Sequence, residues 1–248
     1  GRLTNTKILQ KFPKDWLREF DHASLLGYDH IEFFLEKKIN SKNPIWKKKK
    51  TIVNKIKTLK NKRAIVCDNY SIYNSILEKK NVKYIEKTIN HLSKLPKPKL
   101  IIPLNKDLFN EENLLIKNLK YISNFAKKKH VEISFECDFD SKKIVYLSKK
   151  VKDFKVTFDT GNVFLIEKNI NASFKRLKYI VNHIHIKDRN RLKMNVVLGT
   201  GLINFESFFK LLKKYKYNKD VTLETNRGND AIMTGHLNLV FIKKLINF

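Results

Sequence analysis

The heptapeptide His183-Ile184-His185-Ile186-Lys187-Asp188-Arg189 alternates between polar and apolar side chains over its first five residues. Side chains two residues apart lie on the same face of a β-strand, so the pattern predicts a strand with Ile184 and Ile186 on one face. The opposite face carries two imidazoles and an ammonium group, which is unusual for a solvated strand face. We expect either an exposed edge strand or the wall of a functional site, and the rest of the sequence distinguishes these alternatives.

Short apolar runs, each about as long as a β-strand, alternate with longer amphipathic segments along the chain. The runs are residues 30–35, 64–67, 100–103, 131–137, 155–158, 183–186 and 221–223. Repeated alternation of strands and helices is typical of an α/β fold with parallel strands, and it favours a (β/α)8 TIM barrel. An open doubly wound sheet is the alternative, but no GxGxxG motif follows a first strand to support it.

The predicted strands number seven, one short of a closed barrel, and the missing strand should be the first. The segment Lys7-Ile8-Leu9-Gln10 is a weak candidate; otherwise the first strand lies upstream of Gly1, in a chain that has been trimmed and lacks its initiator Met. No linker rich in Pro, Gly or Ser divides the sequence. Residues 1–248 therefore predict a single TIM barrel domain that is long enough to bury a sizeable core.

The formal net charge is +28, from 52 Lys and Arg against 24 Asp and Glu. Such a balance ordinarily suggests nucleic acid as a partner. Here the Lys residues are scattered in pairs and short runs, Ile and Asn are also abundant, and Gly is scarce. This joint bias predicts solvated helix faces instead of a phosphate-binding stripe, so we do not expect a nucleic-acid partner.

The two cysteines, Cys67 and Cys137, lie far apart in apolar runs and form no CxxC motif. This arrangement indicates buried, reduced thiols. The longest apolar runs are far shorter than a membrane span, and the N-terminus has no signal-peptide pattern. We therefore predict a cytoplasmic protein with no membrane partner.

Four successive runs end in side chains that can bind a metal ion: Glu136, Asp159, His185 and Glu224. Each alone would more often be a solvated, turn or core residue. The C-terminal ends of the strands of a parallel barrel form one rim, however, so four such residues on consecutive strands favour a site. Three converging carboxylates repel one another unless a cation lies between them. The set suits one divalent ion, Mn²⁺, Mg²⁺, Co²⁺ or Zn²⁺, and the sequence does not choose among these.

Glycine positions support the same rim. The chain has only 7 glycines, and Gly161, Gly199 and Gly201 all follow these strand ends. A sequence that uses so little Gly should keep it where the backbone needs a positive φ or a close approach.

Several segments together resemble the sugar phosphate isomerase/epimerase family of the xylose isomerase-like TIM barrel superfamily, which also includes endonuclease IV. The matching segments are residues 1–3, 26–32, 135–136, 158–162, 183–189, 198–205 and 223–224. They span the chain nearly end to end, and their order and spacing carry the resemblance. In relatives, Gly-Arg-Leu directly follows the first strand, which agrees with a first strand upstream of Gly1.

The resemblance implies a single divalent metal held by Glu136, Asp159, His185 and Glu224. It also implies proton transfer on a sugar or sugar phosphate through an enediolate, with Glu136 and Glu224 as the acid/base pair. Residues that would contact the substrate are Lys187, Arg189, Arg191, Asn162, Gly199 and Gly201. Among these, the turn from Leu198 to Gly201 would offer backbone N–H groups to an anion. A salt bridge from Lys187 to Asp188 or Glu224 is the structural alternative for that lysine.

Two positions depart from the sugar epimerases. Asn162 stands where they often carry His, and Lys142 stands where they carry a second Glu. Both departures count against a free sugar as the substrate, which leaves a phosphorylated or acidic sugar. A homodimer is left open.

Two other functions remain open: an endonuclease IV-like DNA repair enzyme, or a non-catalytic barrel that binds a partner. Endonuclease IV uses a larger set of His ligands for three zinc ions. Of the 7 His here, only His183 and His185 fall near the predicted rim. On this interpretation the opening strand is the inner wall of the barrel, with His183 buried and hydrogen-bonded below His185, and Lys187 nearer the substrate.

Overall fold

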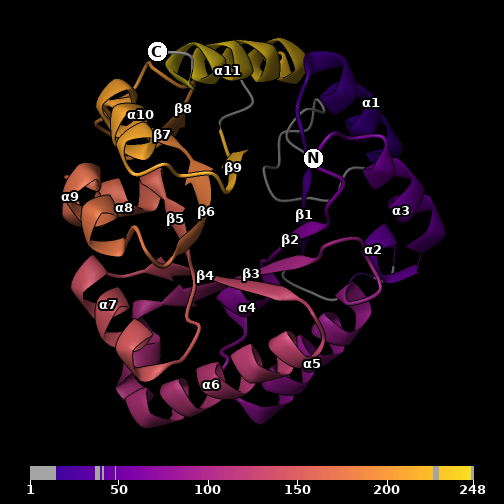
Figure 1. Cartoon of the computed structure of the whole chain (residues 1–248), viewed down its shortest axis with the longest axis vertical. Helices are drawn as coiled ribbons and strands as arrows, with labels where there is room; N and C mark the ends of the chain where they lie inside the picture. The colour runs from indigo at the N-terminus through magenta and orange to yellow at the C-terminus, as the bar shows by residue number, and fades with distance from the viewer. Residues whose placement is uncertain (1–14, 37–39, 41, 48, 226–228, 247–248) are drawn as a thin grey trace.

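The fold comes from a computed structural model that describes residues 15–36, 40, 42–47, 49–225 and 229–246. Within these residues, seven parallel strands form one curved sheet (Figure 1). In spatial order they are β1 (Glu32–Leu35), β2 (Ile65–Asp68), β3 (Lys99–Asn105), β4 (Glu132–Asp138), β5 (Val156–Asp159), β6 (Val181–Ile186) and β9 (Asp220–Leu223). The strands follow one another in chain order without the reversal that defines a doubly wound sheet, so the TIM barrel prediction is confirmed.

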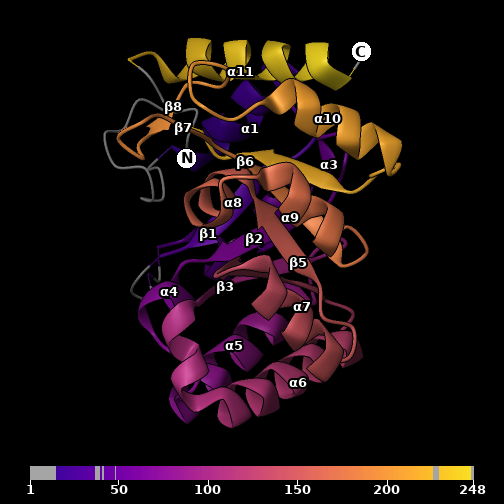
Figure 2. The same ribbon diagram turned by 90° about the vertical axis from the view of Figure 1, so that its left-hand side faces the viewer.

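Helices surround the sheet on its outer face (Figure 1, Figure 2). They are α1 (Trp16–Leu26), α2 (Pro44–Lys47), α3 (Lys49–Lys57), α4 (Tyr70–Tyr73), α5 (Lys79–Leu92), α6 (Glu112–Lys128), α7 (Ser141–Lys150), α8 (Thr160–Glu167), α9 (Ile170–Leu177), α10 (Phe205–Lys214) and α11 (Ala231–Ile246), with a 3-10 helix at Lys106–Glu111. Beyond β6, the short strands β7 (Asp188–Arg189) and β8 (Asn195–Val196) pair antiparallel. No helix in the described part of the chain is both long and apolar enough to cross a bilayer.

The apolar core lies between the sheet and the helices. Phe158 on β5 packs against Phe174 of α9 and Phe208 of α10, with ring centroids 5.5 and 5.6 Å away. The apolar residues of α10 recur at helical spacing and are buried: Phe205, Phe208, Phe209, Leu211 and Leu212. Because successive strand residues face opposite ways, Phe158 points outward to the helices and its neighbours Thr157 and Asp159 face the barrel interior.

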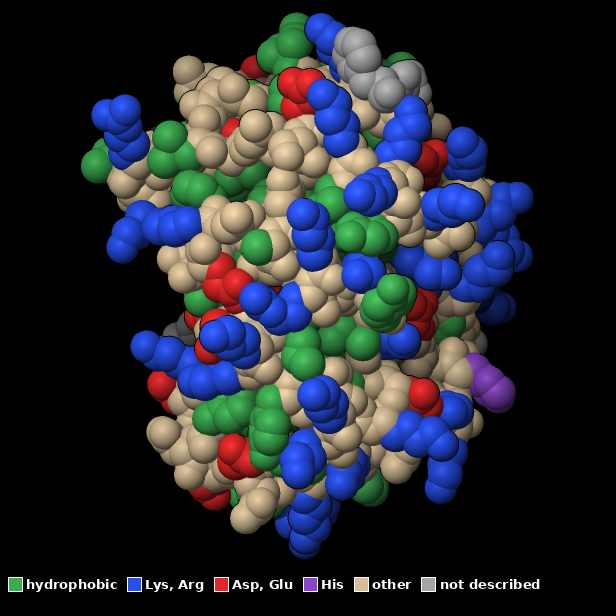
Figure 3. Space-filling model, turned by 60° about the vertical axis from the view of Figure 1, so that its left-hand side comes forward, with side chains coloured by type: hydrophobic (Ala, Val, Ile, Leu, Met, Phe, Trp, Pro, Cys, Tyr) green, Lys and Arg blue, Asp and Glu red, His purple; other side chains and the backbone are tan. Residues whose placement is uncertain are grey.

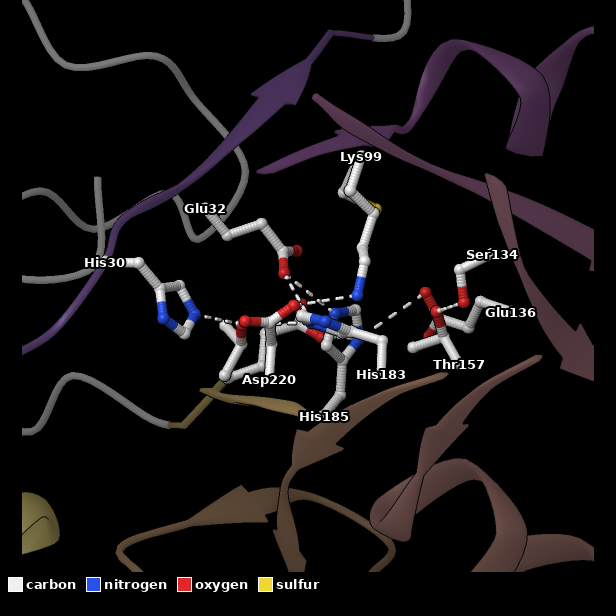
Figure 4. A network of polar contacts seen from close by, with 12 residues as sticks. His30, Glu32, Lys99, Ser134, Glu136, Thr157, His183, His185 and Asp220 are labelled. Carbon is white, nitrogen blue, oxygen red and sulfur yellow. Dashed lines mark hydrogen bonds and ion pairs between the residues drawn. The ribbon is translucent and has the colours of Figure 1, made fainter. Parts of the chain in front are cut away.

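The same alternation resolves the opening strand. Every residue of β6 is buried, with Ile184 and Ile186 in the apolar core. His183 and His185 are 0% exposed and face inward, where Figure 4 shows them among polar side chains from other strands. The heptapeptide is therefore the inner wall of a barrel and not an exposed edge.

An ion-pair network closes the N-terminal end of the barrel. Lys99, only 1% exposed, places its Nζ 2.8 Å from Asp220 Oδ2 and 3.4 Å from Glu132 Oε1. Arg63 reaches the same two carboxylates, at 2.7 Å from Asp220 and 2.5 Å from Glu132. Four charges from separate strand starts thus neutralise one another inside the barrel, where an unpaired charge would be costly.

The sheet has two edges within the described residues, β1 and β9. A cavity of about 660 Å³ is bounded by residues of both edge strands and of α1 and α11, and it reaches Glu32 and Glu224. His30 Nε2 lies 3.0 Å from Thr222 Oγ1, so a hydrogen bond joins the two edges. The candidate first strand at residues 7–10 lies outside the described residues.

Candidate metal centre

The four predicted ligands meet at one place on the C-terminal rim. Glu136 lies on β4, Asp159 ends β5, His185 lies on β6 and Glu224 directly follows β9. His185 Nδ1 is 3.6 Å from Glu136 Oε2, 3.7 Å from Asp159 Oδ2 and 3.3 Å from Glu224 Oε2. The structure thus brings together one imidazole nitrogen and three carboxylate oxygens from four separate strands.

This donor set fits a divalent cation. Within the described residues, His185 Nδ1 is buried and has no hydrogen-bond partner, although three carboxylate oxygens lie within 3.7 Å of it. Ligand atoms bound to one cation at about 2.1 Å lie about 3–4 Å apart, which matches the observed separations. Imidazole and carboxylate ligands suit Mn²⁺, Mg²⁺, Co²⁺ or Zn²⁺ alike.

The segment after β5 explains how Asp159 is oriented. Asp159 caps helix α8, because its Oδ1 accepts the Asn162 backbone N–H at 2.9 Å. The other carboxylate oxygen, Oδ2, therefore remains directed at the cluster. Gly161 is needed for packing: a Cβ at this position would lie 2.7 Å from the Lys187 Cβ, which confirms the expected close backbone approach.

Lys187 lies inside the carboxylate cluster. Its Nζ is 2.7 Å from Asp159 Oδ2 and 2.6 Å from Glu224 Oε2. Burial disfavours the charged ammonium, but the attraction of Asp159, Glu224 and Glu136 outweighs it and raises the pKa of Lys187. The predicted alternative, a salt bridge to Glu224, is thus formed.

The pKa values of the candidate ligands His185 and Glu136 are both raised, for different reasons. Burial lowers the pKa of His185, but Glu32 and Glu136 outweigh burial and raise it well above the usual value. Burial raises the pKa of Glu136, and His185 and Lys187 only partly offset this. A cation at this centre would need the neutral imidazole, so its binding would release a proton from His185.

A polar chain leads outward from Glu136. Asn162 donates from Nδ2 to Glu136 Oε1 at 3.1 Å, and Arg189 donates from Nη2 to Asn162 Oδ1 at 3.3 Å. Asn162, predicted to bind substrate, thus contacts the candidate ligand Glu136 directly. Among the described residues, Arg189 Nε is buried without a hydrogen-bond partner, whereas Arg191 is exposed in the turn between β7 and β8.

The turn predicted to bind an anion is already filled by the chain itself. The backbone N–H groups of Gly199 and Gly201 donate to Asp188 Oδ2 at 3.0 and 2.9 Å. Asp188 is fully buried, and a Cβ on Gly201 would lie 2.2 Å from its Oδ1. The prediction that these two amides contact substrate is therefore wrong, because an internal carboxylate is their acceptor.

Sequence reasoning gave no role to Glu32, which reaches the centre from β1. Its Oε2 lies 3.0 Å from His183 Nε2 and 3.1 Å from His185 Nε2 (Figure 4). These three residues also form a metal-capable group, but here Glu32 accepts hydrogen bonds from both rings. His183 is buried and hydrogen-bonded as predicted, and burial lowers its pKa to about 4, so it stays neutral. In the sequence, His30 and Glu32 alternate with Ile31 and Phe33, and this alternation could have indicated that Glu32 faces the barrel interior.

Solved structures share this fold along nearly the whole chain. D-psicose 3-epimerase from Clostridium cellulolyticum H10, solved with D-tagatose, covers 96% of each chain with a TM-score of 0.78 and 15% identity. A 3-keto-D-glucoside 4-epimerase from E. coli covers 97% of each chain with a TM-score of 0.71 and 16% identity. A xylose isomerase-like TIM barrel protein from Mycobacterium smegmatis, solved with magnesium, covers 96% of this chain and 90% of that one, with a TM-score of 0.68 and 14% identity.

Sequence comparison places the chain more directly. An uncharacterised protein of Methanocaldococcus jannaschii is 32% identical over 128 residues, a stretch that covers 48% of this chain and about half (49%) of that relative. The family model of the xylose isomerase-like TIM barrel matches residues 20–241, which include all four residues of the candidate centre. The chain therefore belongs to the xylose isomerase-like TIM barrel family, as its sequence motifs indicated.

Proposed function

We propose that this protein is a metal-dependent isomerase or epimerase that transfers a proton on a sugar or sugar phosphate. The observation that carries the proposal is the convergence of His185 Nδ1 with three carboxylate oxygens at 3.3–3.7 Å. Structural neighbours that act on ketoses and keto-sugars, and one that holds magnesium, support it. The bound divalent ion would supply a Lewis acid that stabilises negative charge on substrate oxygens.

Glu136 and Glu224 are the acid/base pair in this proposal. They extend from β4 and from the end of β9, so they approach the centre from different sides of the rim. One carboxylate removes a proton from a C–H bond beside the substrate carbonyl, which leaves an enediolate, and the other carboxylic acid returns a proton to it.

Lys187, Arg189 and Arg191 would bind the rest of the substrate. Lys187 lies within the cluster and Arg189 beside it, and among the described residues Arg189 Nε has no hydrogen-bond acceptor. A phosphate or carboxylate group of the substrate would satisfy Arg189. Arg191, exposed in the adjacent turn, would contact the outer part of a bound sugar phosphate. The proposed substrate is therefore a phosphorylated or acidic sugar.

Solvent-exchange measurements test the reaction. The protein, purified without chelators, should hold or take up one divalent ion, and it should exchange a substrate C–H proton with ²H₂O when ketoses and ketose phosphates are screened by NMR. Glu224→Gln should abolish this exchange, since it removes one of the two proton-transferring groups. Glu206→Gln is the matched control, because Glu206 is exposed on α10 and pairs only with Lys210 in the described contacts.

Two results would contradict the proposal. A chain that neither contains nor binds a divalent ion excludes the metal centre. Full exchange in Glu224→Gln, with metal still bound, removes Glu224 from the mechanism.

A further inference from the structure

Glu32 makes a contact that the four-ligand centre does not require. A single carboxylate oxygen, Oε2, lies within hydrogen-bond distance of two imidazole nitrogens, His183 Nε2 at 3.0 Å and His185 Nε2 at 3.1 Å. The donor rings lie on β6 and the acceptor on β1, so the contact crosses the barrel interior and joins strands that are not neighbours in the sheet (Figure 4). The side chain of Glu32 is only 10% exposed, which shields these hydrogen bonds from water.

The contact determines which nitrogen of His185 carries a proton. Nε2 must be protonated to donate to Glu32, since an ionised carboxylate only accepts hydrogen bonds. In a neutral ring, Nδ1 then keeps its lone pair, and Nδ1 is the nitrogen that lies 3.3–3.7 Å from the three carboxylates. A metal-binding imidazole needs this tautomer and a fixed ring orientation, which an outer carboxylate commonly provides.

His183 keeps Glu32 in place. Its ring is fully buried and stands at right angles to that of His185, with the centroids 5.1 Å apart. Thr222 Oγ1 lies 3.0 Å from His183 Nε2 and also 3.0 Å from His30 Nε2, so the hydroxyl links the two rings across the barrel edges. Glu32 is therefore held by a second imidazole that takes no part in the four-ligand cluster.

We infer that Glu32 is a positioning residue of the metal centre: it orients His185 and fixes the proton on Nε2, so that Nδ1 is presented to the divalent ion. This inference rests on the proposed function, since it needs the ion to bind at His185. It adds a fifth strand, β1, to the four that carry the ligands. Loss of the Glu32 carboxylate should therefore weaken the binding of the divalent ion, although all four ligands remain.

Metal affinity tests the inference independently of catalysis. The dissociation constant of Mn²⁺, measured by electron paramagnetic resonance of free Mn²⁺, should rise about 10–100-fold in Glu32→Gln. Thr222→Val is the matched control, because it removes the hydroxyl shared by His30 and His183 but leaves the bond from His185 to Glu32 intact. Its Mn²⁺ affinity should stay within about threefold of the unsubstituted protein.

A second measurement needs no substitution and applies even where Glu32→Gln does not fold. In the ¹⁵N NMR spectrum of the Zn²⁺-loaded protein, His185 should carry its proton on Nε2, with a low-field proton resonance that exchanges slowly. A proton on Nδ1 of His185 would overturn the inference, as would a Glu32→Gln variant that loses stability while its Mn²⁺ affinity stays within about threefold. Failure of the unsubstituted protein to bind any divalent ion would overturn the proposed function as well.

Discussion

Asp188 accepts the backbone N–H groups that the sequence pattern assigned to a substrate anion. Its Oδ2 accepts the N–H groups of Gly199 and Gly201, and its Oδ1 accepts those of Arg189 and Ile203. The turn from Leu198 to Gly201 does bind an anionic group, but that group is the side chain of Asp188 and not a substrate. This carboxylate therefore fixes the whole loop between β6 and α10 from a fully buried position.

Asp188→Asn should lower the free energy of unfolding by roughly 2–4 kcal/mol, since the amide nitrogen cannot accept and leaves two backbone N–H groups without an acceptor. Urea unfolding followed by circular dichroism measures the change. Asp140→Asn is the control: only Oδ1 of Asp140 accepts there, from Lys142 and Lys143, and Asn caps a helix about as well as Asp. Equal effects of the two substitutions would contradict this role of Asp188.

At the scale of elements, the two ends of the strands carry two different groups of charged side chains inside the barrel. The C-terminal ends of β4, β5, β6 and β9 carry the acidic centre, and the N-terminal ends of β3, β4 and β9 carry the network around Lys99. The two ion-rich layers are joined by buried hydroxyl and amide groups: Ser134 Oγ lies 2.6 Å from Thr157 Oγ1 and 2.6 Å from Asn182 Oδ1. The interior of the barrel is thus polar near β4, β5 and β6. Ile65, Cys67 and Ile101 form a small apolar cluster on β2 and β3, separate from the main apolar core between the sheet and the helices.

Lys99→Met should destabilise the protein by about 3–5 kcal/mol, because it leaves Asp220 and Glu132 with one cation, Arg63, in a buried network. Lys127→Met, which breaks an exposed pair with Asp153, should change stability by less than about 1 kcal/mol.

Burial raises the pKa of Asp220, but Lys99 and Arg63 outweigh it and hold the pKa at about 2, below the usual 3.8. Stabilisation from Asp220 is therefore complete above pH 3.8 and is lost as the pH falls through about 2. A Lys99→Met variant as stable as the parent at pH 7 would contradict this role.

Local periodicity predicted the seven strands of the sheet and, through the rule that their C-terminal ends form one rim, predicted that Glu136, Asp159, His185 and Glu224 lie together. It did not predict Glu32 or Lys99. Glu32 meets His183 and His185 across 151 and 153 residues, and Lys99 meets Asp220 across 121. Such pairs depend on how the sheet curves, and Lys99 in the sequence looks like any other of the abundant lysines.

For the molecule as a whole, the positive net charge suggests nucleic acid as a partner, whereas the candidate metal centre is acidic. Lys and Arg side chains are spread over the face shown in Figure 3, among acidic, polar and apolar groups, and do not form one continuous stripe. The candidate centre is instead acidic, with Glu136, Asp159 and Glu224 around His185. The net charge of +28 therefore comes from scattered surface side chains and does not itself indicate a nucleic-acid site.

We therefore expect weak, sequence-independent DNA binding that depends on salt and leads to no cleavage. Scattered lysines contact phosphates individually, so affinity measured by fluorescence anisotropy should fall steeply between about 50 and 200 mM salt. A duplex with an abasic site, incubated with the protein and Mn²⁺, Mg²⁺, Co²⁺ or Zn²⁺, should remain intact. Glu136→Gln is the control, since it removes a proposed ligand: cleavage that survives this substitution comes from a contaminating nuclease. Cleavage by the unsubstituted protein that disappears in Glu136→Gln would instead assign the acidic centre to phosphodiester hydrolysis and overturn the sugar isomerase proposal.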